Sequence, residues 1–238
     1  MSGDKKISII IPCYPPHVKN IKRALDGLRS QTRLPDEVVV ALSETTRDEG
    51  GYLEKKCSDY PFPVNFYVTA EKQFAGQNRN RGAAVAANEI LVFCDSDDEY
   101  HPQKLEITEY VFREISPKLF LHGFKRNNSV FDLYDKRKLS LVLTQQLFGN
   151  TFGTPSKRNN SLFIFTDRPA VKRWVEGSHP HHGYPSISRD VFEKVKYRDL
   201  PVAEDTEFCL DVLWEFKSAV YADVNLLNYH YCYNKFVK

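Results

Sequence analysis

Three aspartates, Asp95, Asp97 and Asp98, directly follow a short apolar run near the middle of this 238-residue chain. The run itself, residues 90–94, has no helical spacing and is typical of a strand buried on both faces of a parallel sheet. In an extended chain the side chains of Asp95 and Asp97 point to the same side, where their charges repel each other unless a cation lies close by. Carboxylate oxygens suit Mg²⁺ or Mn²⁺. The pattern therefore predicts a divalent-cation site at the end of this strand.

A second pair of acids, Glu204 and Asp205, opens residues 206–216, whose pattern indicates a helix. One of the pair could act as a general base that takes a proton from an attacking hydroxyl group. Both groups of acids also have a purely structural interpretation. A carboxylate at a helix start can be a cap that the helix dipole favours, and Asp95 could cap a helix that begins near Pro102. The residues alone leave both interpretations open.

Aromatic and cationic residues at other predicted strand ends and helix starts could contact an anionic ligand. Tyr14 follows the first predicted strand, so its ring could stack on a base, or it could pack on the helix that it precedes. Arg79 and Arg81 open a predicted helix, residues 78–87, where a phosphate group is favoured, although a solvated helix start is the commoner case.

The histidines gather in the second half of the chain. Three of them, His179, His181 and His182, fall in one predicted loop that could line a pocket or bind a metal. His230 lies between aromatic residues and is by default a packed side chain, but a terminal strand that returns to the sheet could carry it to the predicted cation site.

Strands and helices alternate along the first hundred residues. The predicted strands are residues 7–12, 37–42, 64–69 and 90–94, and the helices between them are residues 18–31, 48–58 and 78–87. This order predicts an α/β fold with a Rossmann-like, mostly parallel sheet and helices on both faces. Ligands of such sheets bind beyond the carboxyl ends of the strands, where Asp95 and Asp97 are expected.

Beyond Asp98 the pattern is looser. Helices are predicted at residues 102–115, 189–195 and 206–216, and strands at residues 119–122, 161–165 and 218–222. Residues 139–148 form an amphipathic piece in a polar and aromatic stretch. Because no linker separates the halves, we expect one domain, residues 1–238, with a nucleotide-binding half, residues 1–100, and a substrate-shaping half, residues 101–238.

The bulk composition excludes several classes of protein. A formal net charge of +2 is too small to indicate nucleic-acid binding. No apolar run is long enough for a transmembrane segment, and the first residues do not resemble a signal peptide. The five cysteines show no metal-binding spacing, which favours reduced thiols and a cytoplasmic location.

The order of these motifs resembles the inverting family 2 of the GT-A glycosyltransferases. The resemblance is carried by residues 8–14 (Ser-Ile-Ile-Ile-Pro-Cys-Tyr), 35–40, 79–82, 93–98, 186–192 and 204–208. It extends from about Ile7 to Phe216. Each motif is loose by itself, but their common order and spacing are specific. The resemblance implies a GT-A fold whose first half binds a nucleoside-diphosphate sugar and whose second half, residues 101–238, binds the acceptor.

The family resemblance also implies roles for individual residues. The donor would lie against Pro12, Cys13, Tyr14, Ser43, Glu44, Arg79, Arg81, Asp95 and Ser96. Tyr14 would stack on the base, and Arg79 or Arg81 would stabilise the leaving diphosphate. Asp97, supported by Asp95, would hold Mn²⁺ or Mg²⁺, with His230 near the metal or the diphosphate. Asp205, beside Glu204, would deprotonate the acceptor hydroxyl for a direct displacement that inverts the anomeric carbon.

The chain departs from the family pattern in three places. Ser43 and Glu44 stand where the family usually has two aspartates, so uridine and guanosine both stay open as the base, with a UDP-sugar favoured. Pro15 replaces the usual asparagine after Tyr14. The Gln-x-x-Arg-Trp motif of processive members is absent, which favours the transfer of a single sugar.

The resulting prediction is a metal-dependent, inverting glycosyltransferase that moves one sugar to a hydroxyl group, most simply of a glycan, or of a lipid-linked or protein acceptor. A sugar nucleotidyltransferase is a weaker alternative, because such enzymes open with a Gly-rich loop that residues 13–16 do not resemble. A non-catalytic module that binds a nucleotide-sugar or a carbohydrate is the other alternative. The two intact pairs of acids argue against it.

Overall fold

The computed structural model describes residues 5–126, 130–139, 141–145, 151–152, 163–164 and 184–229. One sheet contains the strands β1 (Ile7–Cys13), β2 (Glu37–Leu42), β3 (Val64–Val68), β4 (Ile90–Phe93), β5 (Glu99–Tyr100), β6 (Leu119–Arg126), β7 (Leu141–Gln145), β10 (Ser186–Ser188) and β11 (Ser218–Tyr229). Its order is β3-β2-β1-β4-β10-β6-β11-β5, with β7 also paired to β11. A separate two-stranded sheet joins β8 (Thr151–Phe152) and β9 (Phe163–Ile164).

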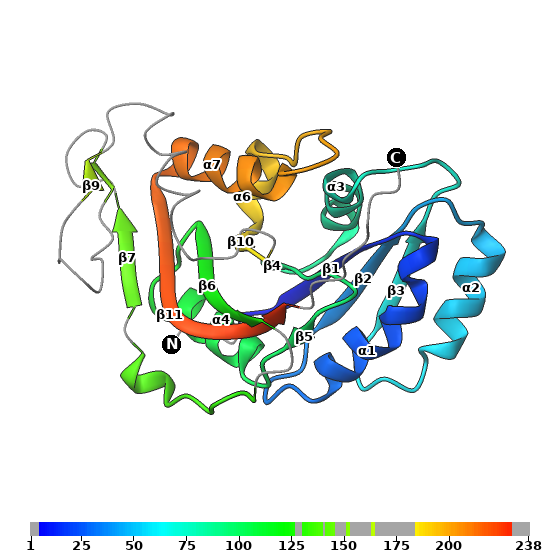
Figure 1. The fold of residues 1–238 in the computed structure, drawn as a ribbon, viewed down its shortest axis with the longest axis horizontal. Coiled ribbons are helices and arrows are strands. Elements are labelled where there is room, and N and C mark those ends of the chain that lie inside the picture. Colours follow the sequence, from blue (N-terminus) through cyan, green and yellow to red (C-terminus); the bar gives the residue numbers. More distant parts are fainter. Residues whose placement is uncertain are drawn as a thin grey trace.

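The first four strands form the parallel part of the sheet (Figure 1). β1 pairs in parallel with both β2 and β4, and β3 extends this arrangement beyond β2. β10 then runs antiparallel between β4 and β6, so that β4 and β6 share one direction, and β11 is parallel to β6. The predicted α/β class with a mostly parallel sheet is confirmed.

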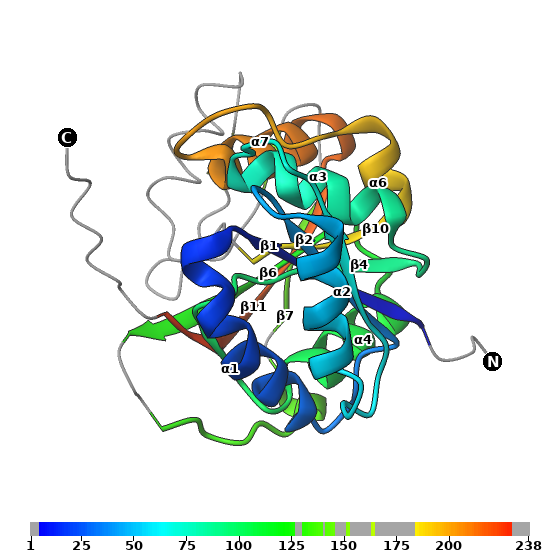
Figure 2. The ribbon, with the colours of Figure 1, turned by 90° about the vertical axis from the view of Figure 1, so that its right-hand side faces the viewer.

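Helices cover both faces of this sheet, as predicted (Figures 1 and 2). One face carries α1 (Val18–Arg29), α2 (Arg47–Lys56) and α4 (Lys104–Glu114), and the other carries α3 (Ala75–Val85), α6 (Arg189–Lys194) and α7 (Glu204–Phe216). Two short 3₁₀ helices, η1 (Pro15–His17) and η2 (Lys136–Lys138), complete the described helices. Alternation along β1 explains the two cores, because Ile9 and Ile11 pack toward α1 whereas Ile10 packs toward α3.

The helix α3 begins at Ala75, three residues before the predicted start at Asn78. The Phe74 backbone N–H donates to Gln77 Oε1 at 2.8 Å, which stabilises this earlier first turn. Arg79 and Arg81 therefore lie in the body of the helix and not at its N-terminus. Farther along α3, Gly82 lets the helix approach the sheet closely, since a Cβ atom there would lie 2.7 Å from Ile10 Cγ2.

Beyond β4 the chain does not stay extended as expected. Residues 96 and 97 form a turn, and the chain reverses into β5, which pairs with the end of β11. β11 reaches both β5 and β6 because its register shifts between Ala222 and Asn225 and again before Asn228, which lets the strand curve (Figure 1). The helix after this turn starts at Lys104, so the alternative in which Asp95 caps it is wrong.

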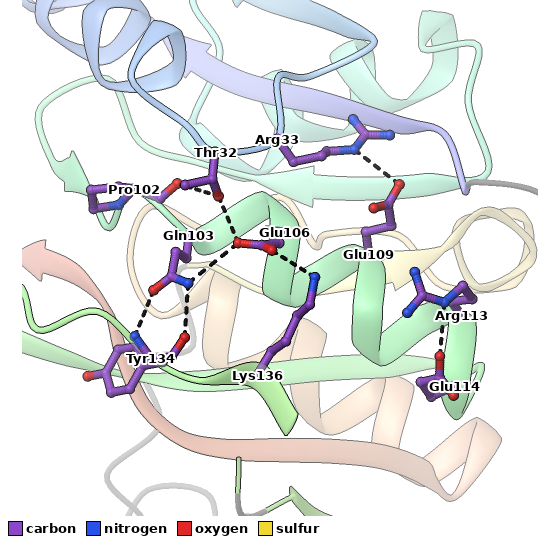
Figure 3. Close-up of polar contacts among 10 residues, drawn as sticks. All are labelled: Thr32, Arg33, Pro102, Gln103, Glu106, Glu109, Arg113, Glu114, Tyr134 and Lys136. Carbon is purple, nitrogen blue, oxygen red and sulfur yellow. Dashed lines mark hydrogen bonds and ion pairs between the residues drawn. The ribbon is translucent and has the colours of Figure 1, made fainter. Parts of the chain in front are cut away.

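The first turn of α4 is tied to segments on both sides of it (Figure 3). The Thr32 backbone N–H donates to the Pro102 carbonyl at 2.8 Å. Gln103 donates from Nε2 to the Tyr134 carbonyl at 3.0 Å and accepts from the Tyr134 N–H at 2.7 Å. These bonds fix the start of α4 just after β5. None of the described helices combines the length and apolar character that a membrane-crossing span requires.

The close approach of α3 to β1 predicts a specific cost for a side chain at position 82. Gly82→Ala is expected to destabilise the protein by about 1–3 kcal/mol, because the branched Ile10 side chain is fully buried and cannot yield. Gly51→Ala in α2 is the matched control, since a Cβ there meets nothing within 4 Å. It is expected to stabilise by about 0.5–1 kcal/mol. Urea unfolding measures both, and equal effects would contradict the packing argument.

Candidate active site

The ends of β1, β2 and β4 meet at one edge of the sheet, because the three strands are parallel neighbours. Asn78 of α3 joins two of these ends. Its Nδ2 donates to the Cys13 carbonyl at 3.1 Å and to Ser43 Oγ at 3.0 Å. The Ser43 hydroxyl is fully buried and donates in turn to the Cys13 carbonyl at 3.4 Å. Ser43 is thus a buried part of this edge of the sheet. The next residue, Glu44, is exposed and has a left-handed φ of 54°.

Tyr14 lies at the end of β1 with 36% of its surface exposed. Its ring centroid is 4.5 Å from that of His17, with the planes tilted by 44°. The ring is therefore partly packed on the turn that follows and partly open, which is compatible with both interpretations of the sequence. Burial raises the pKa of the preceding Cys13 thiol to about 12, so this group is uncharged.

Arg81 and Arg79 have different surroundings although they are two residues apart. Arg81 is partly exposed, donates to Asn78 Oδ1 at 2.7 Å, and lies 5.1 Å above the centroid of the Tyr67 ring. Burial lowers the pKa of its guanidinium. Arg79 is buried and donates from Nη2 to Asp95 Oδ1 at 2.8 Å and from Nη1 to Glu204 Oε1 at 2.6 Å.

Two further residues of α3 complete this part of the site, and sequence reasoning did not single them out. Asn78 makes the bonds to the strand ends described above. Asn80 donates from Nδ2 to the Tyr197 carbonyl at 2.8 Å and accepts from the Tyr197 N–H at 2.9 Å. The only signal in the sequence is their place in the run Asn78-Arg79-Asn80-Arg81, since polar amides on a helix start usually face solvent.

The acidic turn after β4 contains the predicted cation ligands. Burial raises the pKa of the Asp97 carboxyl, and the neighbouring Asp95 raises it further, against smaller opposing effects of His17 and Arg23. The Arg23 guanidinium donates to the Asp97 carbonyl oxygen. Ser96 is buried, with Oγ 3.5 Å from His17 Nδ1. A partly buried carboxylate held beside a second acid is a donor set that a divalent cation stabilises, so these residues fit the predicted metal.

The metal prediction extends only partly onto the described residues. Within them, no group of three or more histidine, cysteine, aspartate or glutamate side chains could enclose a metal. His179, His181, His182 and His230 lie outside the described residues. Asp95 and Asp97 alone would leave most of the coordination sphere to other oxygens, which is how Mg²⁺ is usually bound beside phosphates.

Glu204 and Asp205 differ in exposure although they are adjacent at the start of α7. Glu204 is buried and accepts from Arg79, whereas Asp205 is partly exposed and accepts from the Thr206 N–H at 2.7 Å. The preceding Ala203 has a left-handed φ of 62°, which sets the direction of the first turn of the helix. Of the two acids, Asp205 is therefore the one that an incoming hydroxyl group can reach.

A buried lysine lies behind the acidic turn. Lys104 of α4 is fully buried, with Nζ 3.0 Å from His122 Nε2. Burial lowers the pKa of its ammonium group, while Cys94, Asp98 and Asp95 act in the opposite direction. Nothing in the sequence indicated that Lys104 is buried, because a lysine on a helix is normally exposed.

The described cysteines, which are Cys13, Cys57, Cys94 and Cys209, form no disulfide.

The protein is thus an α/β protein with an open sheet, and its candidate site lies at the carboxyl ends of the parallel strands. The family model described as "Glycosyl transferase family 2" matches residues 8–195. The chain therefore belongs to glycosyltransferase family 2, and the family predicted from the sequence is confirmed.

Two curated relatives agree with this assignment. An uncharacterized glycosyltransferase from Nostoc sp. is 30% identical over 111 residues, which are 45% of this chain and 33% of that protein. An uncharacterized glycosyltransferase from Haemophilus influenzae is 31% identical over 100 residues, 42% of this chain and 32% of that protein. The matched segment thus spans about a third of the length of these relatives.

Solved structures share the fold at low sequence identity. Residues 1–349 of S. aureus TarS superpose with a TM-score of 0.67 at 19% identity, covering 94% of this chain and 60% of that one. The same protein with UDP-GlcNAc gives 0.64. Glucosyl-3-phosphoglycerate synthase from Mycobacterium tuberculosis, in complex with Mn²⁺, UDP and glucosyl-3-phosphoglycerate, gives 0.56 at 15% identity, covering 94% and 72%. These likenesses confirm the GT-A fold.

The raised pKa of Asp97 predicts a stability effect with a definite sign. The pKa of Asp97 in the folded state lies above the ordinary value of 3.8. Ionisation of Asp97 therefore lowers the stability of the folded state as the pH rises from 3.8 through the folded-state pKa. Asp97→Asn is therefore expected to raise the urea midpoint at pH 7, in the absence of cations, and to lose this advantage at pH values below 3.8.

Asp26→Asn is the control with the opposite sign. A hydrogen bond from Lys22 lowers the pKa of Asp26, so its carboxylate stabilises the folded state at neutral pH. Its replacement is expected to lower the midpoint slightly, since the pair is exposed. A loss of stability at pH 7 for both variants would contradict the argument for Asp97.

Proposed function

We propose that this protein is a metal-dependent, inverting glycosyltransferase that transfers one sugar from a nucleoside-diphosphate sugar to an acceptor hydroxyl. The observation that carries the proposal is the pair of salt bridges by which Arg79 connects Asp95 to Glu204. It joins the acids that follow β4 to the acids that open α7, so that a cation-binding group and a candidate base belong to one site. Family membership supports the same chemistry.

The donor is proposed to be a UDP-sugar. The complexes of TarS with UDP and with UDP-GlcNAc, and that of the mycobacterial synthase with UDP, support a uridine nucleotide on this fold. Tyr14 would stack on the base at the end of β1. The donor would also lie against Pro12, Cys13, Ser43, Glu44 and Ser96. The partly exposed Arg81 is the nearer of the two arginines to solvent and would contact the diphosphate.

Asp97 and Asp95 would hold Mn²⁺ or Mg²⁺ at the diphosphate, and the Mn²⁺ complex of the mycobacterial synthase supports a divalent cation. When bound, the cation would neutralise negative charge on the leaving diphosphate. The role of the protein is to present the carboxylates in ionised form. The raised pKa of Asp97 means that cation binding weakens as the pH falls, at higher pH than for an ordinary aspartate.

Asp205 would act as the general base. Its carboxylate takes the proton of the acceptor hydroxyl while the acceptor oxygen forms a bond to the anomeric carbon of the donor sugar. The bond from that carbon to the diphosphate oxygen breaks, and the nucleoside diphosphate leaves with the electron pair. Attack on the face opposite to the leaving group inverts the anomeric centre. Partial exposure of Asp205 and burial of Glu204 favour this division of roles.

The acceptor is proposed to be a hydroxyl group of a glycan, of a lipid-linked saccharide or of a protein, bound by residues 101–238 of the same domain. The described cysteines form no disulfide, which supports a reducing, cytoplasmic environment.

Donor binding is expected to raise thermal stability in a cation-dependent way. A UDP-sugar at a hundred times its dissociation constant adds about 2.7 kcal/mol to the free energy of unfolding. With Mn²⁺ and a panel of UDP- and GDP-sugars, one nucleotide should raise the melting temperature of the wild type and not that of Asp97→Ala. Asp190→Ala, which removes a surface acid paired with Lys118, is the control and should respond like the wild type. No cation-linked shift with any donor would contradict the metal-diphosphate site.

Replacement of the proposed base is expected to remove turnover and leave donor binding intact. Asp205→Asn should lower kcat by roughly 10²- to 10⁴-fold, the usual contribution of a general base. Its affinity for UDP with Mn²⁺ should match that of the wild type in calorimetry. Asp199→Asn, in the exposed loop before α7, is the control and should keep full activity. A similar kcat in Asp205→Asn and the wild type would mean that another group accepts the proton.

A further inference from the structure

Arg79 lies at the meeting point of three elements that the sequence separates widely. It belongs to α3, and it is buried with 2% of its surface exposed. One terminal nitrogen donates at 2.8 Å to Asp95, just beyond β4, and the other at 2.6 Å to Glu204, in the first turn of α7. Both Nη groups of Arg79 therefore donate to carboxylates of the protein. The family resemblance instead implies a contact between the diphosphate and Arg79 or Arg81.

An aromatic layer holds the guanidinium in place. Arg79 Cζ lies 5.3 Å from the centroid of the Tyr197 ring. Tyr197 stacks on Phe208 of α7, with centroids 3.9 Å apart and planes 7° from parallel, and meets the edge of Phe93 at 5.1 Å. Phe93 is the last residue of β4. The layer therefore joins β4 to α7, which the ion pairs of Arg79 also join.

The first turns of α3 and α7 also pack closely. A Cβ atom at Gly76 would lie 3.0 Å from the Arg198 carbonyl oxygen and 3.1 Å from Glu204 Cγ. Asn80 fixes the intervening loop through both of its bonds to the Tyr197 backbone. A small movement of Arg79 would therefore be transmitted to the start of α7, where Asp205 follows Glu204 directly.

The charge of Arg79 is maintained in spite of its burial. Burial acts to lower the pKa of the guanidinium, but the carboxylates, Asp95 foremost, outweigh that effect and hold the pKa above its ordinary value. The planar fork of arginine can serve two carboxylates at once, which a lysine ammonium on a flexible stem cannot do with the same geometry.

We propose that Arg79 is a positioning residue that locks the base-bearing start of α7 to the cation-binding turn, and that it does not bind the diphosphate. The inference rests on the proposed function, in which Asp205 is the base and the turn at Asp95 belongs to the donor site. Arg79 acts on the reaction through Glu204 and Asp95, whose positions it fixes relative to each other.

Arg79→Lys tests this role because it keeps the charge and removes the fork. We expect kcat to fall by about 10²-fold, a loss that a displacement of a catalytic group by about 1 Å can cause. The donor KM and the affinity for UDP with Mn²⁺ should stay within about twofold of the wild type. A rise in donor KM and UDP dissociation constant with kcat unchanged would show that Arg79 binds the diphosphate, and would overturn the proposal.

Arg198→Lys is the matched control. Arg198 pairs with Asp211 at 2.8 Å and Glu207 at 3.4 Å, so it also holds α7, but it does not contact the donor-side acids. We expect Arg198→Lys to keep its kcat. If Arg79 only stabilised the fold, both variants would lose melting temperature and neither would lose kcat in assays well below melting. That result would also overturn the proposal.

A double-mutant cycle of Asp95→Asn and Glu204→Gln, measured by urea unfolding, tests whether Arg79 couples the two acids. It needs no substrate and does not require Arg79→Lys to fold. Because the two acids share one arginine, their effects on the midpoint should be non-additive. Additive effects would overturn the link. If the wild type transfers no sugar from any donor, the proposed function fails, whereas this cycle still reports separately on whether Arg79 couples the two acids.

Discussion

One buried positive charge between two carboxylates is the constraint on which the site depends. Removing one partner of a buried ion pair costs about 3–5 kcal/mol, because the charge left behind has lost both water and its counter-ion. Arg79 has two such partners, Asp95 and Glu204, so its buried charge is left without a carboxylate only when both are removed. The end of β4 and the start of α7 are therefore held in the one arrangement in which both carboxylates reach the guanidinium.

The strands β1, β2 and β4 could be predicted from the sequence almost residue by residue, because they are apolar runs buried on both faces. Each was found within one residue at each end. The second half was harder. β6 continues through Gly123 and β11 through two register shifts, so neither keeps a regular pattern. The two residues of β5 are too few to give any periodicity.

The positions of the candidate acids could be predicted because they follow from the local pattern, at a strand end and at a helix start. The environment of each arginine could not. Residues two apart on an α-helix are separated by about 200° around the axis, so Arg79 and Arg81 necessarily face different surroundings. Which of them is buried depends on the Tyr197 loop and on α7, more than a hundred residues later in the chain.

The same arginine gives the two aspartates of the turn different properties. Asp95 accepts a hydrogen bond from the buried Arg79 guanidinium at 2.8 Å. Asp97 is also partly buried, but it experiences the charge of Asp95, and its pKa is raised. A cation beside the pair would favour the ionised form of Asp97 against the effects of burial and of the Asp95 charge. The two carboxylates thus differ in their surroundings, because the Arg79 guanidinium contacts Asp95.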